Sequence, residues 1–474
     1  MNSIKKNFLY HSLYQILAML IPLITTPYIS RVLGADGVGV YSYTYSIANY
    51  FGIFILLGLN NYGNRSIAQV RDDSSRLSSA FWEIYAQQLV LGVIISAVYI
   101  LYSVLFASDP LIALIMGIYV VSNVFDINWL FFGLEKFRLT VMRNTIVKIV
   151  TTVCIFVFVR DENDVWKYCL IMTGGMLVSQ VVLWPYVMVH IRRVRPRFSD
   201  IRKHIRPNLL LFLTVLATSL FKIMDKIMLG LMTFTAQVGY YESSERIIQI
   251  PTALIISLGT VMLPRMSNMA VSQKKDQSTE LIGKSIVFAM FLSTSLCFGI
   301  MGISKTFVPL FYGEGYQPCI LLFEILMPSC VSLAFANVIR TQYLLPQKMD
   351  KVYVISAFLG AAVNISINLL LIPKMQAAGA AIGTLAAEAV VCFYQSFMVR
   401  AYLPLKKYII RSIPYIISGG VMCLILWQID FTAVPELVNL LLQILCGIGI
   451  YFGMLLIQFV LYRKVTGKPL RKLL

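Results

Sequence analysis

The sequence is poor in charge, and the few charges that it has are unbalanced. Asp, Glu, Lys and Arg together make up 13% of the 474 residues, against about a quarter in soluble globular domains. Acidic residues are the rarer kind, with 22 Asp and Glu against 40 Lys and Arg, for a net charge of +18. Hydrophobic residues reach 58%. This composition argues against a soluble globular protein.

Several kinds of site are also missing from the sequence. There are only three histidines and no H-E-x-x-H pattern, and the eight cysteines are scattered without a C-x-x-C pair, so we expect no metal site and no cofactor. No G-x-x-x-x-G-K-S/T motif occurs, and no hydrophilic segment is long enough to form a nucleotide-binding domain. The pattern favours a transporter without an ATPase motif over an enzyme.

Long apolar runs fill the chain instead. About fourteen of them match the ~30 Å hydrocarbon core of a bilayer at 1.5 Å per helical residue. The sequence therefore predicts an all-α polytopic membrane protein. The predicted spans are 8–32, 38–60, 80–106, 111–133, 140–160, 166–190, 207–232, 238–263, 284–308, 319–345, 350–373, 377–402, 408–428 and 437–462.

The basic residues report the orientation of these spans. With a cytoplasmic N-terminus, about 30 Lys and Arg fall in cytoplasmic segments and about 4 in outward loops, as the positive-inside rule requires. Both termini are therefore expected in the cytoplasm. The basic surface is suited to anionic lipid headgroups of the bilayer, and we expect no nucleic-acid partner.

The strongest hydrophilic interruption, at 191–206, predicts how the chain is divided. Pro196 and Pro207 are expected to break helices there. One interpretation is a plain cytoplasmic loop; the other is a linker between structural repeats. The second predicts an N-terminal lobe of six spans (1–190), a basic linker (191–206), a C-terminal lobe of six spans (207–402), and two further spans with a basic tail (403–474).

An approximate internal repeat supports the linker interpretation. Val32-Leu33-Gly34 is followed by Val38-Gly39-Val40-Tyr41, and Met228-Leu229-Gly230 by Val238-Gly239-Tyr240-Tyr241. Two six-helix lobes entering from the same side are related by a pseudo-two-fold axis, and transporters often bind substrate between such repeats. The G-x-x-x-G pairs Gly379–Gly383 and Gly449–Gly453 are expected to pack helices closely.

Charged residues inside the spans are the candidate functional residues, because a charge at mid-bilayer costs from ~2.5 kcal/mol upward. Lys222, Asp225 and Lys226 lie within two helical turns, and one carboxylate cannot neutralise both lysines. Some of the other charged residues also have a structural explanation. The Arg31 side chain could extend to the outer membrane interface, and Glu242 and Arg246 could form a buried structural ion pair. Arg340 could lie near the cytoplasmic end of its span and follow the positive-inside rule. Excess buried cation predicts an anionic, phosphate-bearing ligand. The predicted cationic cavity comprises Arg31, Lys148, Lys222, Lys226, Arg246 and Arg340.

Carboxylates in the spans are candidates for coupling to a proton or sodium ion, since burial raises a carboxyl pKa and allows proton exchange. These candidates are Asp225, Glu242, Glu388 and Asp126.

Four stretches together carry a family resemblance. They are Pro27–Gly34 with Gly39–Tyr41, Asp126–Phe137, Asp225–Gly230, and Asn364–Pro373 continuing through Gly379–Ala381 to Glu388. In this order the chain resembles the oligosaccharide flippases of the polysaccharide transporter family, within the superfamily that also holds multidrug exporters and the lipid II flippase.

The resemblance implies two lobes that form a V around a central cationic cavity, with alternating access. The implied substrate is an undecaprenyl-diphosphate-linked oligosaccharide, moved to the outer leaflet of a bacterial cytoplasmic membrane for capsule, O-antigen or exopolysaccharide assembly. By analogy with the lipid II flippase, spans thirteen and fourteen would form a lipid groove. A polymerase and a chain-length regulator are further partners that the resemblance suggests.

Three other functions stay open at this point. A lipid II flippase would share the cationic cavity. A multidrug or cation exporter would need an acidic or aromatic one. An integral-membrane polysaccharide polymerase would need a sizeable outward loop, whereas the outward loops here are short.

Overall fold

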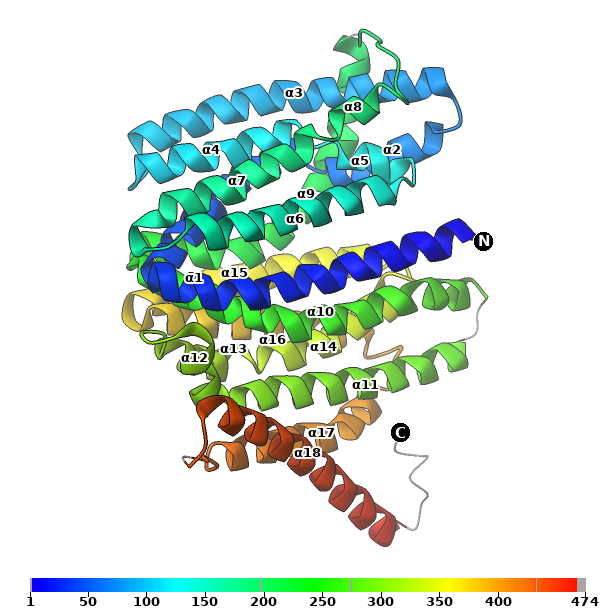
Figure 1. Ribbon diagram of the computed structural model, residues 1–474. Coiled ribbons are helices and arrows are strands. Elements are labelled where there is room, and N and C mark those ends of the chain that lie inside the picture. The colour runs from blue at the N-terminus through cyan, green and yellow to red at the C-terminus, as the bar shows by residue number, and fades with distance from the viewer. Residues whose placement is uncertain (1, 197, 273–274, 432, 467–474) are drawn as a thin grey trace. The chain divides into compact units, whose positions relative to one another are not determined.

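The computed structural model describes residues 2–196, 198–272, 275–431 and 433–466 (Figure 1). Within these ranges every regular element is a helix and no strand occurs. Twelve helices are long and apolar enough to cross a membrane, and a bent pair, Asp200–Ala217 with Lys222–Met232, brings the number to thirteen. The first of the twelve, Leu20–Val70, contains parts of the first two predicted spans. The predicted all-α polytopic membrane fold is confirmed.

The chain divides into two compact units, Met1–Ile227 and Met228–Leu474. The division falls inside helix α9 (Phe198–Met232), which carries the predicted seventh span. Each unit has hydrophobic clusters of its own, around Met116 and Phe81 in the first and around Ala334 and Tyr451 in the second. The predicted lobe boundaries stay a prediction.

The first unit is a bundle of long helices that run nearly side by side in Figure 1. Helix α4 packs against α1, α3 and α7, and α6 packs against α1 and α7. The elements that precede α9 are α1 (Asn2–Leu56), α2 (Leu59–Val70), α3 (Ser74–Leu105), α4 (Pro110–Val124), α5 (Asn128–Gly133), α6 (Phe137–Phe158), η1 (Glu162–Asp164), α7 (Val165–Val181) and α8 (Trp184–Val187).

The helix ends in this unit follow from local sequence. Gly34 divides α1 into two helices because its φ of 66° and ψ of 179° lie in a region that only glycine adopts readily. Asp73 caps α3 by accepting bonds from the backbone N–H groups of Arg76 and Ser75, which lower its carboxyl pKa. Asp109 caps α4, with Pro110 in the first turn.

The expectation that Pro207 breaks the chain is wrong. Helix α9 begins at Phe198, so that most of the predicted linker is helical, and Pro207 lies inside the helix. Proline removes only one backbone N–H, a loss that a helix tolerates with local bending when the rest of it is well packed. Pro196, in contrast, precedes the helix. A bend of 60° in α9 lies further on, between Ala217 and Lys222.

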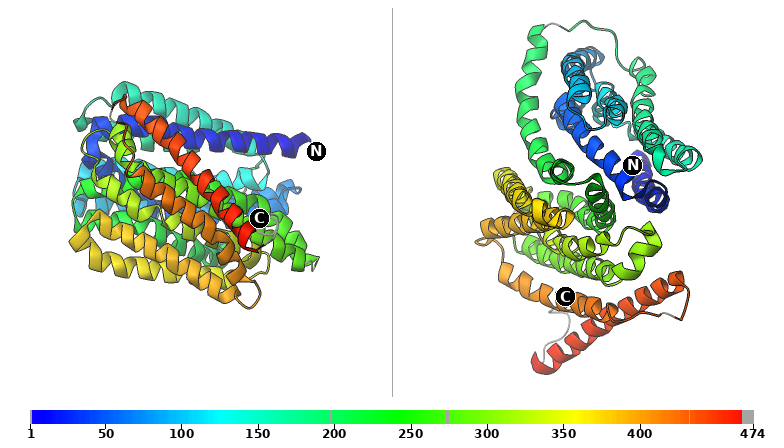
Figure 2. Two further views of the ribbon diagram at one scale, coloured as in Figure 1. Left: turned by 90° about the horizontal axis from the view of Figure 1, so that it is seen from below. Right: turned by 90° about the vertical axis from the view of Figure 1, so that its left-hand side faces the viewer.

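The second unit contains the remaining long helices, of which α18 crosses the others obliquely (Figures 1 and 2). Helices α15 and α16 pack along each other, as do α11 and α17. The elements are α10 (Thr235–Val271), α11 (Lys275–Gly302), α12 (Ser304–Tyr312), α13 (Pro318–Leu326), α14 (Ser329–Ile339), the π-helical turn η2 (Arg340–Leu344), α15 (Asp350–Met375), α16 (Ala377–Val399), α17 (Leu405–Leu426) and α18 (Glu436–Thr466).

The two G-x-x-x-G pairs differ in how closely neighbouring helices pack against them. A Cβ at Gly379 would lie 2.6 Å from the backbone of Leu371, and one at Gly383 would overlap the Asn368 amide, so this pair brings α16 close to α15 as predicted. Around Gly449 and Gly453 no described atom lies within 4 Å of such a Cβ. The packing role predicted for that second pair is therefore wrong within the described residues, because α18 turns this face away from its neighbours.

Candidate functional site

The most elaborate polar site in the first unit lies where the fourth predicted span is interrupted. Helix α4 ends at Val124 and α5 begins at Asn128, which leaves carbonyl groups between them without helical partners. The Gln88 amide of α3 donates to the carbonyls of Asn123 and Asp126, both at 2.8 Å. The Trp184 indole donates to the Phe125 carbonyl at 3.1 Å. Side chains that are distant in sequence thus donate hydrogen bonds to the backbone carbonyl groups at the helix break, inside the bundle.

Asp126 lies at this break and is almost fully buried, at 8% exposure. Its Oδ1 accepts bonds from the backbone N–H and the side-chain amide of Asn128, at 2.9 and 2.7 Å. The nearby guanidinium of Arg143, on α6, acts on the same carboxylate electrostatically. A buried carboxylate needs such donors to remain inside a membrane bundle.

Arg143 is the main functional candidate that the sequence analysis missed. It is 7% exposed and donates to Asn128 Oδ1 at 3.1 Å, to Asn144 Oδ1 at 2.6 Å and to Gln180 Oε1 at 3.4 Å. Ser179 completes the network with a bond to Asn144. The signal was present in the sequence, as an arginine four residues inside a predicted span, but its position near the span end made it look like an interfacial charge.

The charged residues of the predicted seventh span lie on the part of α9 that comes after its bend. Asp225 is buried, at 2% exposure, Lys226 is half-buried and Lys222 is exposed. Tyr50 of α1, in the same unit, lies close enough to Asp225 for the two side chains to interact electrostatically. The two lysines on either side of the buried Asp225 therefore differ in exposure, since Lys222 is exposed and Lys226 is half-buried.

Arg31 and Lys148, the other cationic candidates of the first unit, lie on different helices. Arg31 is exposed one turn before Gly34 and donates to the Pro27 carbonyl at 3.0 Å. Lys148 is half-buried on α6.

In the second unit, Glu242 and Arg246 form an ion pair at 2.8 Å, one turn apart on α10. Both side chains are mostly buried, at 13% and 21% exposure. Tyr312 of α12 packs close to this pair and donates to the Ser243 carbonyl at 2.7 Å. The geometry agrees with the structural-pair interpretation of these two residues, and a role in transport stays a prediction.

Arg340 and Glu388 lie apart from that pair in sequence and on other helices. Arg340, in the π-helical turn η2, donates to Asn337 Oδ1 at 2.6 Å and lies 5.4 Å from the centre of the Tyr353 ring. Glu388 is half-buried on α16 and acts electrostatically on the thiols of Cys330 and Cys392. No group of His, Cys, Asp and Glu in the described part of the chain has the arrangement of a metal site.

The predicted cationic residues are thus divided between the two units. Arg31, Lys148, Lys222 and Lys226 belong to the first, and Arg246 and Arg340 belong to the second. The shared cationic cavity stays a prediction.

Comparison with known proteins identifies the family of this chain. The model of a family described as "Polysaccharide biosynthesis protein" matches residues 4–270. An Escherichia coli K12 protein named as a candidate O-antigen transporter is 25% identical over 406 residues, which cover 84% of this chain and 97% of that protein.

Solved structures show the same fold. The lipid II flippase MurJ in an inward-closed conformation has a TM-score of 0.72 at 16% identity, covering 97% of this chain and 99% of its own. An inward-facing multidrug transporter of the MATE family, in the MOP superfamily, has a TM-score of 0.58 at 14% identity, covering 81% and 97%. This chain therefore belongs to the polysaccharide biosynthesis protein family and has the fold of MOP-superfamily transporters.

Proposed function

We propose that this protein is a flippase for undecaprenyl-diphosphate-linked oligosaccharide repeat units. It moves them from the cytoplasmic to the outer leaflet of a bacterial cytoplasmic membrane, for capsule, O-antigen or exopolysaccharide assembly. The observation that carries the proposal is the placement of two lysines, Lys222 and Lys226, one turn apart on the membrane-spanning helix α9, on either side of the single carboxylate of Asp225. The family match and the similarity to a candidate O-antigen transporter support it.

In the proposed mechanism, the lysines of α9 neutralise the diphosphate while the prenyl tail stays in lipid. Lys222 and Lys226 act as point charges toward phosphate oxygens, with Arg31, Lys148, Arg246 and Arg340 as further members of the cationic cavity. No covalent bond changes, so the protein works as a transporter. The membrane potential helps an anion leave a negative interior, by roughly 5 kcal/mol for two charges at 100 mV.

Ion coupling would add to this driving force, with a proton or sodium ion entering in exchange. Asp225 and Glu388 are the first residues to test. Glu242 already pairs with Arg246 at 2.8 Å, and Asp126 already accepts two bonds from Asn128, so either would have to give up those partners to take part.

Complementation of a strain that lacks its exporter tests the proposal. We expect Lys222→Gln with Lys226→Gln to abolish surface polysaccharide at unchanged protein level, because two charges that bind phosphate are lost. Lys305→Gln, which removes an exposed lysine of α12, is the matched control and should keep export. Full export by the double variant would contradict the role of these lysines.

A vesicle assay separates the competing functions. Labelled lipid-linked oligosaccharide should change leaflet without polymer growth, whereas growth of polymer would indicate a polymerase. Lipid II transport in preference to the oligosaccharide would favour a lipid II flippase, which the 0.72 TM-score makes the second candidate. Transport of cationic drugs alone would favour a multidrug exporter.

In an Asp225→Asn variant, unchanged export with unchanged proton dependence would remove Asp225 from ion coupling.

A further inference from the structure

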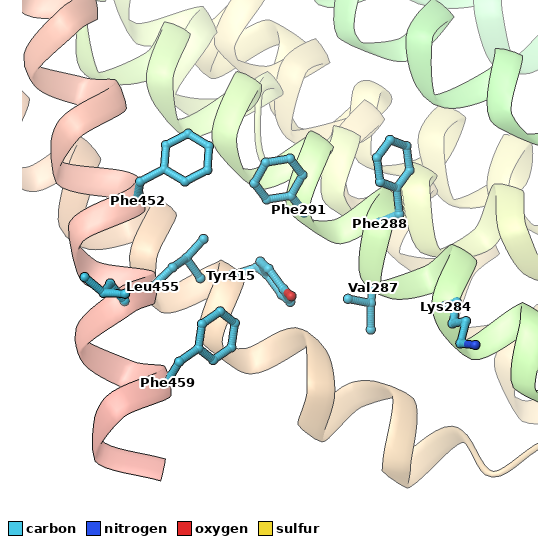
Figure 3. A pocket seen from close by; sticks show the side chains of 9 residues that line it. Lys284, Val287, Phe288, Phe291, Tyr415, Phe452, Leu455 and Phe459 are labelled. Carbon is cyan, nitrogen blue, oxygen red and sulfur yellow. The ribbon is translucent and has the colours of Figure 1, made fainter. Parts of the chain in front are cut away.

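Two features of the molecule have no part in the proposed mechanism. The groove among α11, α17 and α18 is lined by aliphatic and aromatic side chains, with Lys284 at one end (Figure 3), and the hydrocarbon of a bilayer satisfies such a lining. Gln87 and Asn208 of the first unit differ from it, because their side chains are polar and only 5% and 0% exposed. Buried amides need hydrogen-bond partners.

Three amide atoms of these two side chains have no such partner in the protein. Among the described residues, no group forms a hydrogen bond with Gln87 Oε1, Gln87 Nε2 or Asn208 Nδ2, and none of the three atoms reaches the surface. Asn208 Oδ1, in contrast, accepts from the backbone N–H of Gly58 at 2.9 Å. An unsatisfied buried group costs about 1–3 kcal/mol. Two donors and one acceptor thus require a partner that both accepts and donates.

The two amides lie one helical turn beyond a buried pair of titratable side chains. His204 Nε2 of α9 lies 2.9 Å from Glu83 Oε2 of α3. Gln87 follows Glu83 by four residues on α3, and Asn208 follows His204 by four residues on α9. Residues four apart share one face of a helix. Both helices begin on the predicted cytoplasmic side, so the amides lie further into the membrane than the titratable pair.

The hydrogen bonds of His204 suit reversible protonation of its ring. The ionised Glu83 carboxylate can only accept, so Nε2 carries the hydrogen between these two groups. Nδ1 lies 2.6 Å from the hydroxyl of Tyr62 on α2, which can donate to a neutral ring or accept from a protonated one. Both protonation states therefore use the same positions of the heavy atoms. His204 can take up and release a proton without movement of a helix.

The titratable groups around His204 come from three helices. Glu83 of α3 and Tyr62 of α2 contact the ring directly. Lys203, beside it on α9, pairs with the same Glu83 oxygen at 2.9 Å, and Asp200 acts electrostatically on Lys203. The Lys203 side chain is 56% exposed and the Glu83 side chain 10%, so water screens the lysine more than the carboxylate. The Glu83 carboxylate can thus balance the charge of an imidazolium that it contacts.

We propose that His204 and Glu83 form a proton-exchange site on the cytoplasmic side, and that ordered water held by Gln87 and Asn208 extends this site into the membrane. Water accepts from both amide nitrogens and donates to the Gln87 oxygen, whereas a bare cation would face two donors. The proposal names a proton as the coupling ion, and in this it rests on the proposed function. Proton binding and hydration do not depend on transport.

Histidine nitrogen chemical shifts of the full-length protein in nanodiscs test the proton site. The chain has only three histidines, His11, His190 and His204, and a His204→Gln variant assigns the signal. We expect the His204 ring to carry its hydrogen on Nε2 at high pH and to gain a second on Nδ1 as the pH falls. Glu83→Gln should lower the proton affinity of this ring about tenfold, because a contacting negative charge is lost. Glu135→Gln, which removes an exposed carboxylate of the same unit, should leave it unchanged.

Magnetisation transfer from water to side-chain amides, in the same samples, tests the hydrated part. Gln87 and Asn208 should receive magnetisation from water although both are buried. Gln88, the next residue on α3, is the matched control, because its Nε2 donates to the Asp126 carbonyl at 2.8 Å and its Oε1 accepts from the Trp129 indole at 3.1 Å. We expect no transfer to Gln88.

A vesicle assay links the site to transport. A proton gradient should stimulate export by wild type and by His190→Gln, but export by His204→Gln should not respond to it. Unchanged stimulation in His204→Gln, or none in wild type, would remove the site from transport. A His204 ring that keeps one protonation state between about pH 5 and pH 9, or Gln87 and Asn208 amides as dry as Gln88, would overturn the site itself. Since both spectroscopic tests work without substrate, their failure is distinct from failure of the proposed function.

Discussion

Single buried charges in this protein are held largely by amides. Arg143 donates to the side-chain oxygens of Asn128, Asn144 and Gln180, and Asp126 accepts from Asn128 rather than from a direct ion pair. Amide side chains cost less to bury than charges, and they satisfy several donors at once. The network thereby keeps one cation and one carboxylate inside the bundle at moderate cost.

Removal of Arg143 should be among the most destabilising single changes in the first unit. Arg143→Met removes the guanidinium from three amide oxygens, of which Asn144 Oδ1 and Gln180 Oε1 keep a second donor, Ser179 and Asn128. It also leaves Asp126 without its nearby cation, so we expect a loss of about 3–5 kcal/mol in the free energy of unfolding. Thermal or denaturant unfolding in detergent measures it. Arg138→Met, an exposed arginine on the same helix, is the control. Asp126→Asn combined with Arg143→Met should cost less than the sum of the two single changes, and strict additivity would argue against coupling.

The glycines of α16 give a second prediction at this scale. A methyl group at Gly379 would lie 2.6 Å from the Leu371 backbone, which cannot move cheaply, so Gly379→Ala should cost about 1–3 kcal/mol. At Gly420 of α17 nothing described lies within 4 Å, and alanine there should stabilise the helix by up to ~1 kcal/mol. Opposite shifts of the unfolding temperature are expected for the two variants; two shifts of the same sign would contradict the close packing of α15 and α16.

At the scale of the helix, the start of α9 is fastened to the first unit by a buried polar chain. His204 Nε2 lies 2.9 Å from Glu83 Oε2 on α3, and its Nδ1 lies 2.6 Å from the Tyr62 hydroxyl on α2. Lys203 pairs with the same Glu83 oxygen at 2.9 Å. Asn208 adds a bond to the backbone N–H of Gly58. These contacts explain why α9 continues through Pro207, since both sides of the proline are anchored.

Loss of the Glu83 charge should loosen this part of α9. In Glu83→Gln the bonds from Lys203 and His204 lose their charge assistance, which is worth roughly a tenfold change in a local opening equilibrium. Hydrogen–deuterium exchange of the amides at 203–212 should rise by about that factor, while amides of α16 stay protected. Glu280→Gln, which removes an exposed carboxylate, should leave both regions unchanged. An unaltered exchange pattern in Glu83→Gln would mean that packing alone holds α9.

The broken fourth span shows what helix-scale reasoning from sequence can reach. The run at 111–133 is apolar enough to predict one span, and the structure places α4 and α5 within it. The interruption depends on Gln88 and Trp184, which are distant in sequence and supply the missing donors. Local composition carries no information on such partners.

At the scale of the whole molecule, the charge distribution predicts which side of the membrane each end occupies. A green fluorescent protein fused after Leu474 should fluoresce, and alkaline phosphatase at the same site should be inactive, because the positive-inside rule places the basic tail in the cytoplasm. Fusions after Asp109, in a predicted outward loop, should give the reverse and serve as the control. Active phosphatase at the C-terminus would contradict the predicted topology.

Sequence alone determined the class of this protein and the places where its helices lie. The length of an apolar run is a local property that the thickness of the bilayer sets, so the spans could be read directly, and the seventh-span charges stood out against an apolar helix. Only the tertiary structure decided which charges are buried and with which partners. It placed Arg143 in a network of amides and carried α9 through Pro207. Each of these depends on contacts between residues far apart in the chain, which only the packing of complete helices brings together.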